Sequence, residues 1–232
     1  MSVVQPIRDE KQIQTIYEFL KNKDTRFSLI WQFCIGSGLR VSDILNLRIS
    51  DVREKELIKV RESNSNKYKV YPIRETLKND LIAFFKEDRN RSCKPMELLF
   101  VSDNGGKMLC PEVYKVFNDA IKELGLDINL STHKLRKTFG YHHYKQFKDI
   151  TTLQMIFNQT SSAKTIKYIG INQEKNKNKS NALTYPCEDV KIPKTKNIPM
   201  KVVTTSTIDD GNAEIIKHLI HIENLLQQLI NK

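Results

Sequence analysis

Cysteine and long apolar runs are both scarce in this sequence. The four cysteines among the 232 residues are scattered and form no CxxC pair: Cys34, Cys93, Cys110 and Cys187. That spacing offers neither a zinc site nor a disulfide framework, so we expect reduced thiols in a cytoplasmic protein. The longest apolar stretch, around 27–36, is interrupted by polar residues and falls short of the ~20 residues that cross a bilayer. The N-terminus is charged and lacks the apolar segment of a secretory signal, so we expect no membrane partner.

The common signatures of metal and nucleotide chemistry are also missing. None of the five histidines belongs to an HExxH pair or lies near a cysteine at metal-ligand spacing. There is no GxSxG turn and no glycine-rich phosphate loop that ends in GK[ST]. The sequence therefore predicts no bound metal and no cofactor, and it argues against the common metal hydrolases and nucleotide-binding enzymes.

Positive charge, in contrast, is in excess. The chain has 38 Lys and Arg residues against 27 Asp and Glu residues, which gives a formal net charge of +11. Such a charge favours a polyanionic partner, most often nucleic acid, although a basic protein without that partner is an equal alternative on composition alone. The length allows one large domain with appendages, and it is sufficient to bury a core without disulfide or metal support.

The first part of the chain has the patterns of helices and one hairpin. Apolar residues at helical spacing predict an amphipathic helix over 9–23, and a more apolar segment predicts a buried helix over 27–34. That buried helix should end at the glycines of 36–38, and Ser42 is expected to cap the short helix that follows. Two β-prone runs, 57–61 and 68–73, flank a polar turn and predict an antiparallel hairpin.

The following residues, up to 170, are also mainly helical in pattern. Helices are expected over about 77–85, from Pro111 to about Leu124, and after a cap at Ser131 or Thr132. A short buried strand is expected over 98–101. The predicted fold class is therefore mainly α with a small antiparallel β-sheet, in a domain that covers residues 1–170.

The composition changes after residue 170. Segment 171–211 is rich in lysine and asparagine, and we expect an extended arm or linker there. Residues 212–232 predict an amphipathic helix with a heptad seam. The seam consists of Ile215, Leu219, Ile222, Leu226 and Leu229. A homo-oligomer formed through this seam and a helix folded back on the main domain are equal alternatives, because short isolated helices are marginal in water.

Two arginine-centred segments carry the strongest chemical signal. Arg40 follows a glycine turn and precedes a short helix, whereas His133 and Arg136 are three residues apart and share one helical face. Arginine binds phosphate oxygens through two parallel hydrogen bonds. Two arginines and a histidine would therefore hold a phosphodiester and stabilise its pentacoordinate transition state without a metal. The HxxR pair alone is weak evidence, and Tyr168 alone is as well explained by packing.

Three motifs in order turn this signal into a family resemblance. The run GSGLRVSDILNL at 36–47, followed by Ser50-Asp51-Val52, resembles the first arginine motif of the tyrosine recombinases, the phage integrase family. HKLRKTF at 133–139 resembles their HxxR box, and residues 153–168 resemble their LQxxLGHxS…T…Y segment. The resemblance covers about residues 9–170 and implies a tyrosine recombinase catalytic-domain fold.

The resemblance implies a role for each matched residue. Arg40 and Arg136 would hold the scissile phosphate, and Tyr168 would be the nucleophile that forms a 3′-phosphotyrosyl bond. His133 would assist proton transfer or brace the phosphate, and Asp43 would orient an arginine. The implied partner is double-stranded DNA. Further basic side chains expected to contact it are Lys69, Lys134, Lys137, Lys164 and Lys167.

Two positions depart from the family's apparatus for proton transfer. Gln159 stands where the family has His or Trp, and glutamine donates a hydrogen bond but carries no proton at neutral pH. Asn64 stands where the family has the hairpin lysine that serves as general acid. Lys67, in the same turn, is the expected substitute, and Lys69 is a weaker candidate. Asn158 also replaces the glycine of the family's LGH.

The function expected from these residues is that of a site-specific recombinase or integrase that cleaves and rejoins duplex DNA. A separate DNA-clamping domain, which precedes the catalytic core in many family members, is not expected in a chain of this length. The altered residues keep two alternatives open: a recombinase-fold DNA-binding regulator of the repressor type, and a relaxase-like nicking protein. Three matched motifs disfavour a merely oligomerising basic protein.

Overall fold

A computed structural model describes residues 4–62, 68–87 and 94–171. The expected arm, the C-terminal helix with its heptad seam, and Lys67 lie outside the described residues. The helices and strands in chain order are α1 (Glu10–Lys23), α2 (Thr25–Ser37), α3 (Val41–Ile44), α4 (Ile49–Val52), β1 (Leu57–Arg61), β2 (Tyr68–Pro72), α5 (Glu75–Lys86), α7 (Cys110–Glu123), α8 (Thr132–Phe147), α9 (Ile150–Phe157) and α10 (Ser162–Tyr168). No helix in these ranges has both the length and the hydropathy that a bilayer crossing needs.

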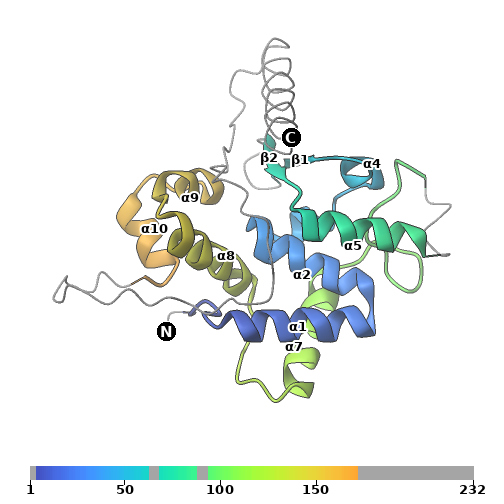
Figure 1. Ribbon diagram of the computed structural model, residues 1–232, viewed down its shortest axis with the longest axis horizontal. Coiled ribbons are helices and arrows are strands. Elements are labelled where there is room, and N and C mark those ends of the chain that lie inside the picture. The colour runs from blue at the N-terminus through green and yellow to red at the C-terminus, as the bar shows by residue number, and fades with distance from the viewer. Residues whose placement is uncertain (1–3, 63–67, 88–93, 172–232) are drawn as a thin grey trace, which may run out of the picture.

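Helix α2 is the centre of the main core. It begins at an aspartate cap, where the Asp24 carboxylate accepts a hydrogen bond from the backbone N–H of Arg26, and most of its residues are buried. It contacts α1, α3, α5, α7 and α8, and Figure 1 shows it between α5 and α1. Trp31 of α2 packs edge-on against Phe117 of α7, with ring centroids 5.3 Å apart. This packing fixes the end of α2, from which the first arginine segment continues.

A second, smaller core joins α8, α9 and α10, which lie together on one side of the molecule (Figure 1). Gly140 of α8 allows the three helices to approach closely. A Cβ atom at this position would lie 2.6 Å from Ile169 and 2.8 Å from the ring of Phe157. These three helices carry the HxxR box and the tyrosine, so their packing sets the distance between the two motifs.

The sheet is a two-stranded antiparallel hairpin of β1 and β2, in the register Leu57↔Pro72 to Arg61↔Tyr68. Side chains alternate between the two faces of each strand. Lys69 and Tyr71 of β2 are therefore buried on the same face. Glu62, which directly follows β1, is buried as well. The inner face of this hairpin thus contains two charged side chains.

Residues 4–8 form a segment, here called the N-terminal strap, that lies against α8 and the end of α10. The backbone N–H of Ile7 donates to Thr138 at 2.9 Å, and Lys137 donates to the carbonyl of Val4 at 2.9 Å. The Arg8 guanidinium donates to the carbonyl of Gly170 at 3.0 Å. The strap therefore ties the start of the described chain to the helix that carries the tyrosine.

The mainly helical fold class and the antiparallel hairpin are confirmed. Two local predictions were wrong. Ser42 does not cap α3; it lies inside the helix, whose N-cap residue is Arg40. Residues 98–101 do not form a strand, because Leu98 and Val101 each make a single isolated bridge, to different partners on either side. A strand needs a continuous ladder of such bridges, and the two partner segments are too far apart in sequence to provide one.

Candidate active site

Arg40 lies at the turn between α2 and α3. The turn depends on Gly38, which has φ +67°, and a Cβ atom there would lie 2.3 Å from the ring of Phe139. One terminal nitrogen of Arg40 lies 3.8 Å from a carboxylate oxygen of Asp43 and 3.6 Å from one of Glu62. That nitrogen is buried and has no hydrogen-bond partner among the described residues. The guanidinium is therefore held near two acids by charge, with donor capacity left for a ligand.

Arg136 approaches Arg40 from helix α8. Its side chain is buried, and its two terminal nitrogens donate to the backbone carbonyls of Gly38 and Ile156. The guanidinium also lies over the ring of Phe157, 4.8 Å from the centroid. Burial, followed by the nearby charge of Arg40, lowers the pKa of Arg136. Two like charges held together in this way favour an anion between them.

Tyr168 is the last residue of α10, and its ring packs edge-on against Phe157 at 5.3 Å and His133 at 6.4 Å. Burial raises the pKa of its phenol, whereas the charges of Arg136 and Arg40 lower it and offset part of that rise. The net rise means that the hydroxyl keeps its proton at neutral pH. Three residues separated by up to 128 positions are therefore near neighbours in space.

The remaining residues predicted for the site lie around this group. His133, at the start of α8, is exposed, so a substrate can reach its ring. Asp43 is buried beneath Arg40, within the ion-pair distance given above. The side-chain oxygen of Gln159, just after α9, is buried without a hydrogen-bond partner in the described part of the chain.

Lys69, expected to contact DNA, is instead completely buried. Its ammonium donates to Glu62 at 3.0 Å and to the carbonyls of Met155 and Ile156 at 2.8 and 2.9 Å. A lysine ammonium has three N–H donors, and all three are used here. Lys69 is therefore not placed to contact a DNA backbone, and its network is considered further below.

The other lysines expected to contact DNA differ in exposure. Lys164 and Lys167 are exposed on α10, and Lys134 is half-buried on α8. Lys137 is only 8% exposed; its ammonium lies 5.0 Å from the ring centroid of Tyr168 and donates to the strap. The two lysines of α10 are therefore the members of this set best exposed to a polyanion, while Lys137 acts within the protein.

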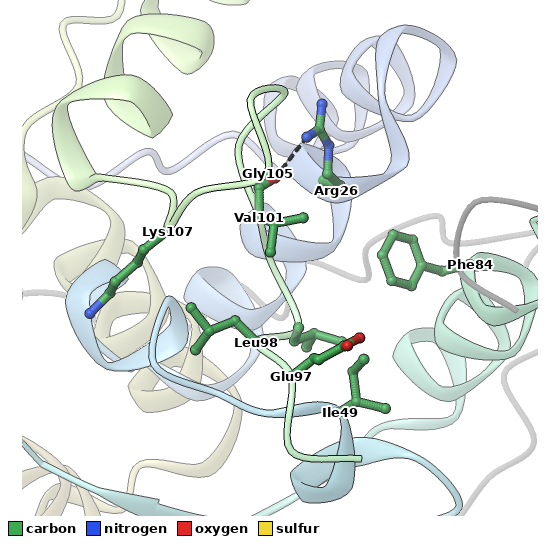
Figure 2. Close-up of a pocket in the computed structure, with 9 residues that line it drawn as sticks. Arg26, Ile49, Phe84, Glu97, Leu98, Val101, Gly105 and Lys107 are labelled. Carbon is green, nitrogen blue, oxygen red and sulfur yellow. Dashed lines mark hydrogen bonds between the residues drawn. The ribbon is translucent and has the colours of Figure 1, made fainter. Parts of the chain in front are cut away.

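A cavity of about 400 Å³ lies elsewhere, among α4, α5 and the segment 97–107 (Figure 2). Phe84 and Ile49 face it, and Arg26 at its edge donates to the carbonyl of Val101 at 2.7 Å. None of the three clustered residues, the two arginines and the tyrosine, lines this cavity. Within residues 4–62, 68–87 and 94–171, no group of three or more His, Cys, Asp or Glu side chains is arranged to hold a metal ion.

Glu62 was not predicted to belong to the site, and Asn158 was recognised only as a departure from the family motif. Glu62 accepts hydrogen bonds from Lys69 at 3.0 Å and from the side-chain amide of Asn158 at 2.7 Å. The alternation of β1 contained a signal, because Ile58 and Val60 face inward and position 62 continues that series. The partner of Glu62 was not visible in the pattern, because Asn158 belongs to a helix end 96 residues away.

Comparison with known proteins places the chain in a family. The chain matches the phage integrase family over residues 8–175 and belongs to it. It is 38% identical over 175 residues to the probable integrase/recombinase YoeC of Bacillus subtilis (strain 168), a match that covers 75% of this chain and 93% of that protein. It is 31% identical over 162 residues to the tyrosine recombinase XerA of Pyrococcus horikoshii, covering 68% of this chain and 53% of the relative.

Solved structures agree with this assignment. A crystal structure of XerA recombinase superposes with a TM-score of 0.63 at 26% identity, over 73% of this chain and 62% of that one. A lambda integrase dimer bound to a COC′ core site shares the fold, with a TM-score of 0.58 at 16% identity over 79% of this chain and 53% of that one. Apart from YoeC, these relatives are matched over only half to three fifths of their length.

Proposed function

We propose that this protein is a DNA strand transferase that cleaves and rejoins duplex DNA through a 3′-phosphotyrosyl bond to Tyr168. The observation that carries the proposal is the meeting of Arg40, Arg136 and Tyr168 from three separate segments, close enough for both arginines to act on the phenol. Membership of a family whose relatives are named recombinases supports it.

The cleavage step uses each of these groups. The phenolic oxygen of Tyr168 attacks the phosphorus, the new P–O bond forms, and the bond from phosphorus to the 5′-oxygen breaks. The two arginines bind the non-bridging oxygens, on which negative charge accumulates in the transition state. His133 receives the phenolic proton as the general base. The amide N–H of Gln159 supplies a further donor without moving a proton.

The leaving 5′-oxygen needs a proton, for which we propose Lys67. Lys69 is not suited to this task, because its three N–H donors are already bound. The covalent bond retains the energy of the original phosphodiester. A 5′-hydroxyl can therefore attack the phosphotyrosyl bond and reseal the strand, so that neither ATP nor a metal is required for the exchange.

The proposed partner is double-stranded DNA, bound to the face that carries Tyr168. Lys164 and Lys167 on α10 are exposed beside the nucleophile, and such contacts make affinity fall as salt rises. We also propose that strand exchange uses a homo-oligomer, with the seam from Ile215 to Leu229 as its contact.

Covalent capture of DNA tests the proposal. Duplexes that bind the protein are first selected from a randomised pool, and the selected sequence is then nicked near each position in turn to trap a cleaved strand. We expect a protein–DNA adduct that survives denaturation with wild-type protein. With Tyr168→Phe the adduct should fall at least about 10³-fold at unchanged DNA affinity. Specific binding by both proteins without any adduct would refute strand transfer and favour a DNA-binding regulator.

A further inference from the structure

A polar network, buried at Glu62 and Lys69 and exposed at Asn158, connects the hairpin to the end of α9. The carboxylate of Glu62 accepts from the Lys69 ammonium at 3.0 Å through one oxygen and from the Asn158 amide at 2.7 Å through the other. Lys69 also donates to the carbonyls of Met155 and Ile156, in the last turn of α9. Glu62 and Lys69 are both 0% exposed, so the ion pair has no contact with water. A pair of this kind is strongly disturbed when only one partner is removed.

The network touches both arginines of the site. The carbonyl of Ile156 accepts one hydrogen bond from Lys69 and another from Arg136, each at 2.9 Å. The Glu62 oxygen that accepts from Lys69 lies 3.6 Å from Arg40. The same carboxylate oxygen therefore faces both cations, and Lys69 is the closer of the two. The charged side chains here are the cations Arg40, Arg136 and Lys69 and the anions Glu62 and Asp43. Their sum is one positive charge, which matches the single negative charge of a phosphodiester.

The backbone conformation at residue 158 suits asparagine, whose side chain also completes the network. It follows α9 in the left-handed conformation, with φ 55° and ψ 47°, which asparagine tolerates better than most residues other than glycine. Glycine would adopt the same backbone conformation but has no side chain to reach Glu62. The amide of Asn158 therefore adds a hydrogen bond from the end of α9 to the hairpin.

We infer that Glu62, Lys69 and Asn158 are positioning residues that hold Arg40 and Arg136 apart at the spacing a scissile phosphate requires. The inference rests on the proposed strand-transfer function, whereas the hydrogen bonds among these residues are present in the protein without DNA. Lys69 neutralises Glu62, so that Arg40 stays available to the phosphate. Without Lys69, Arg40 becomes the nearest cation to a buried carboxylate, and a direct ion pair would draw it away from Tyr168.

The test compares Lys69→Met with the double variant Lys69→Met/Glu62→Gln. Lys69→Met keeps most of the side-chain volume but removes the cation closest to Glu62, whereas the double variant removes both charges. Lys59→Met is the matched control, because Lys59 is an exposed lysine of the same hairpin. Fluorescence of the buried Trp31 shows that each variant is folded before it is compared.

The first readout is the ionisation of Tyr168 in the free protein, followed by NMR of ¹³C-labelled tyrosine with Tyr168→Phe to identify its signal. The charges of Arg136 and Arg40 lower the pKa of this phenol. We therefore expect Lys69→Met to raise it further and the double variant to return it towards the wild-type value. If the network only stabilised the fold, the pKa of Tyr168 in the double variant would differ from the wild-type value at least as much as it does in Lys69→Met. An unchanged pKa in Lys69→Met would overturn the inference.

The second readout is the rate of adduct formation at saturating DNA. A displacement of about 1 Å at a reacting centre lowers rates by up to about 10²-fold. We expect a fall of about 10- to 100-fold for Lys69→Met, recovery in the double variant, and DNA affinity within about twofold of the Lys59→Met control. Equal rates in Lys69→Met and wild type would overturn the inference. If the pKa of Tyr168 responds as expected and no protein forms an adduct, the inference stands and the strand-transfer function fails.

Discussion

Replacement of Gly38 by alanine should destabilise the protein and disturb the site at the same time. Gly38 has φ +67°, and an alanine Cβ would lie 2.3 Å from the ring of Phe139. The left-handed backbone costs about 1–2 kcal/mol for a residue with a Cβ atom. Overpacking costs typically a further 1–3 kcal/mol. We therefore expect a loss of about 2–5 kcal/mol, which for a domain of this size lowers Tm by roughly 5–15 °C.

Gly36 provides a control two residues away. It lies inside α2, and an added Cβ would have no heavy atom within 4 Å. Gly36→Ala should therefore be neutral or stabilise the protein by up to about 1 kcal/mol, because alanine favours a helix. Thermal and urea unfolding, followed by the fluorescence of Trp31, measures both variants. Equal stability of Gly38→Ala and wild type would refute the reasoning from backbone strain and contact with Phe139.

The functional effect of Gly38→Ala follows from its carbonyl, which accepts a hydrogen bond from Arg136. A displaced turn moves that acceptor and the backbone that leads into Arg40. We expect adduct formation to fall more than the folded fraction does, when both are measured at a temperature where the variant is still folded. A decrease that merely follows the folded fraction would mean that the turn contributes to stability alone.

Three further outcomes are expected. Burial raises the pKa of Asp80, but hydrogen bonds to its carboxylate, the largest from Lys21, outweigh this effect and lower the pKa. The free energy of unfolding of Asp80→Asn should therefore be about 1–3 kcal/mol below that of wild type at pH 7. This difference should shrink as the pH falls below 4 and through the lowered pKa of Asp80, which urea unfolding at several pH values would show. Lys164→Met should reduce the slope of log Kd against log salt by about one, whereas the buried Lys137→Met should leave the slope unchanged; equal slopes for both would contradict the surface proposed for DNA. Ile222→Lys should release monomers in light scattering if the seam is the oligomer contact, and an unchanged mass would discard that contact.

Arg40, Arg136 and Tyr168 could be named from the sequence as candidate site residues, because each lies in a short motif whose residue order is visible without a fold. The helices were also predictable where apolar residues recur at helical spacing, as in α1. Ser42 was misjudged because a serine before an apolar run is a common cap, and here the helix begins at Val41, two residues before the predicted start.

The contacts that hold the site together were not predictable in the same way. Lys69 is the second residue of β2, close to the turn of the hairpin, and its charge favoured a position at the surface. Its burial depends on three acceptors, two of them backbone carbonyls at the end of α9, more than 80 residues away. Every residue has a backbone carbonyl, so the amino-acid sequence does not show which carbonyls accept a hydrogen bond from a side chain. Only the tertiary structure shows that this lysine, like Arg136, is bound to the end of α9.

The N-terminal strap has a consequence for the order of folding. Ile7 meets Thr138 across 131 residues, and Arg8 meets Gly170 across 162. During synthesis the strap leaves the ribosome well before its partners on α8 and at the end of α10. Closing so long a loop is entropically unfavourable until the intervening helices are in place. We therefore expect the strap to be among the last segments protected from hydrogen exchange in refolding, after the core around α2, so that the helix that carries Tyr168 is secured only after that core has formed.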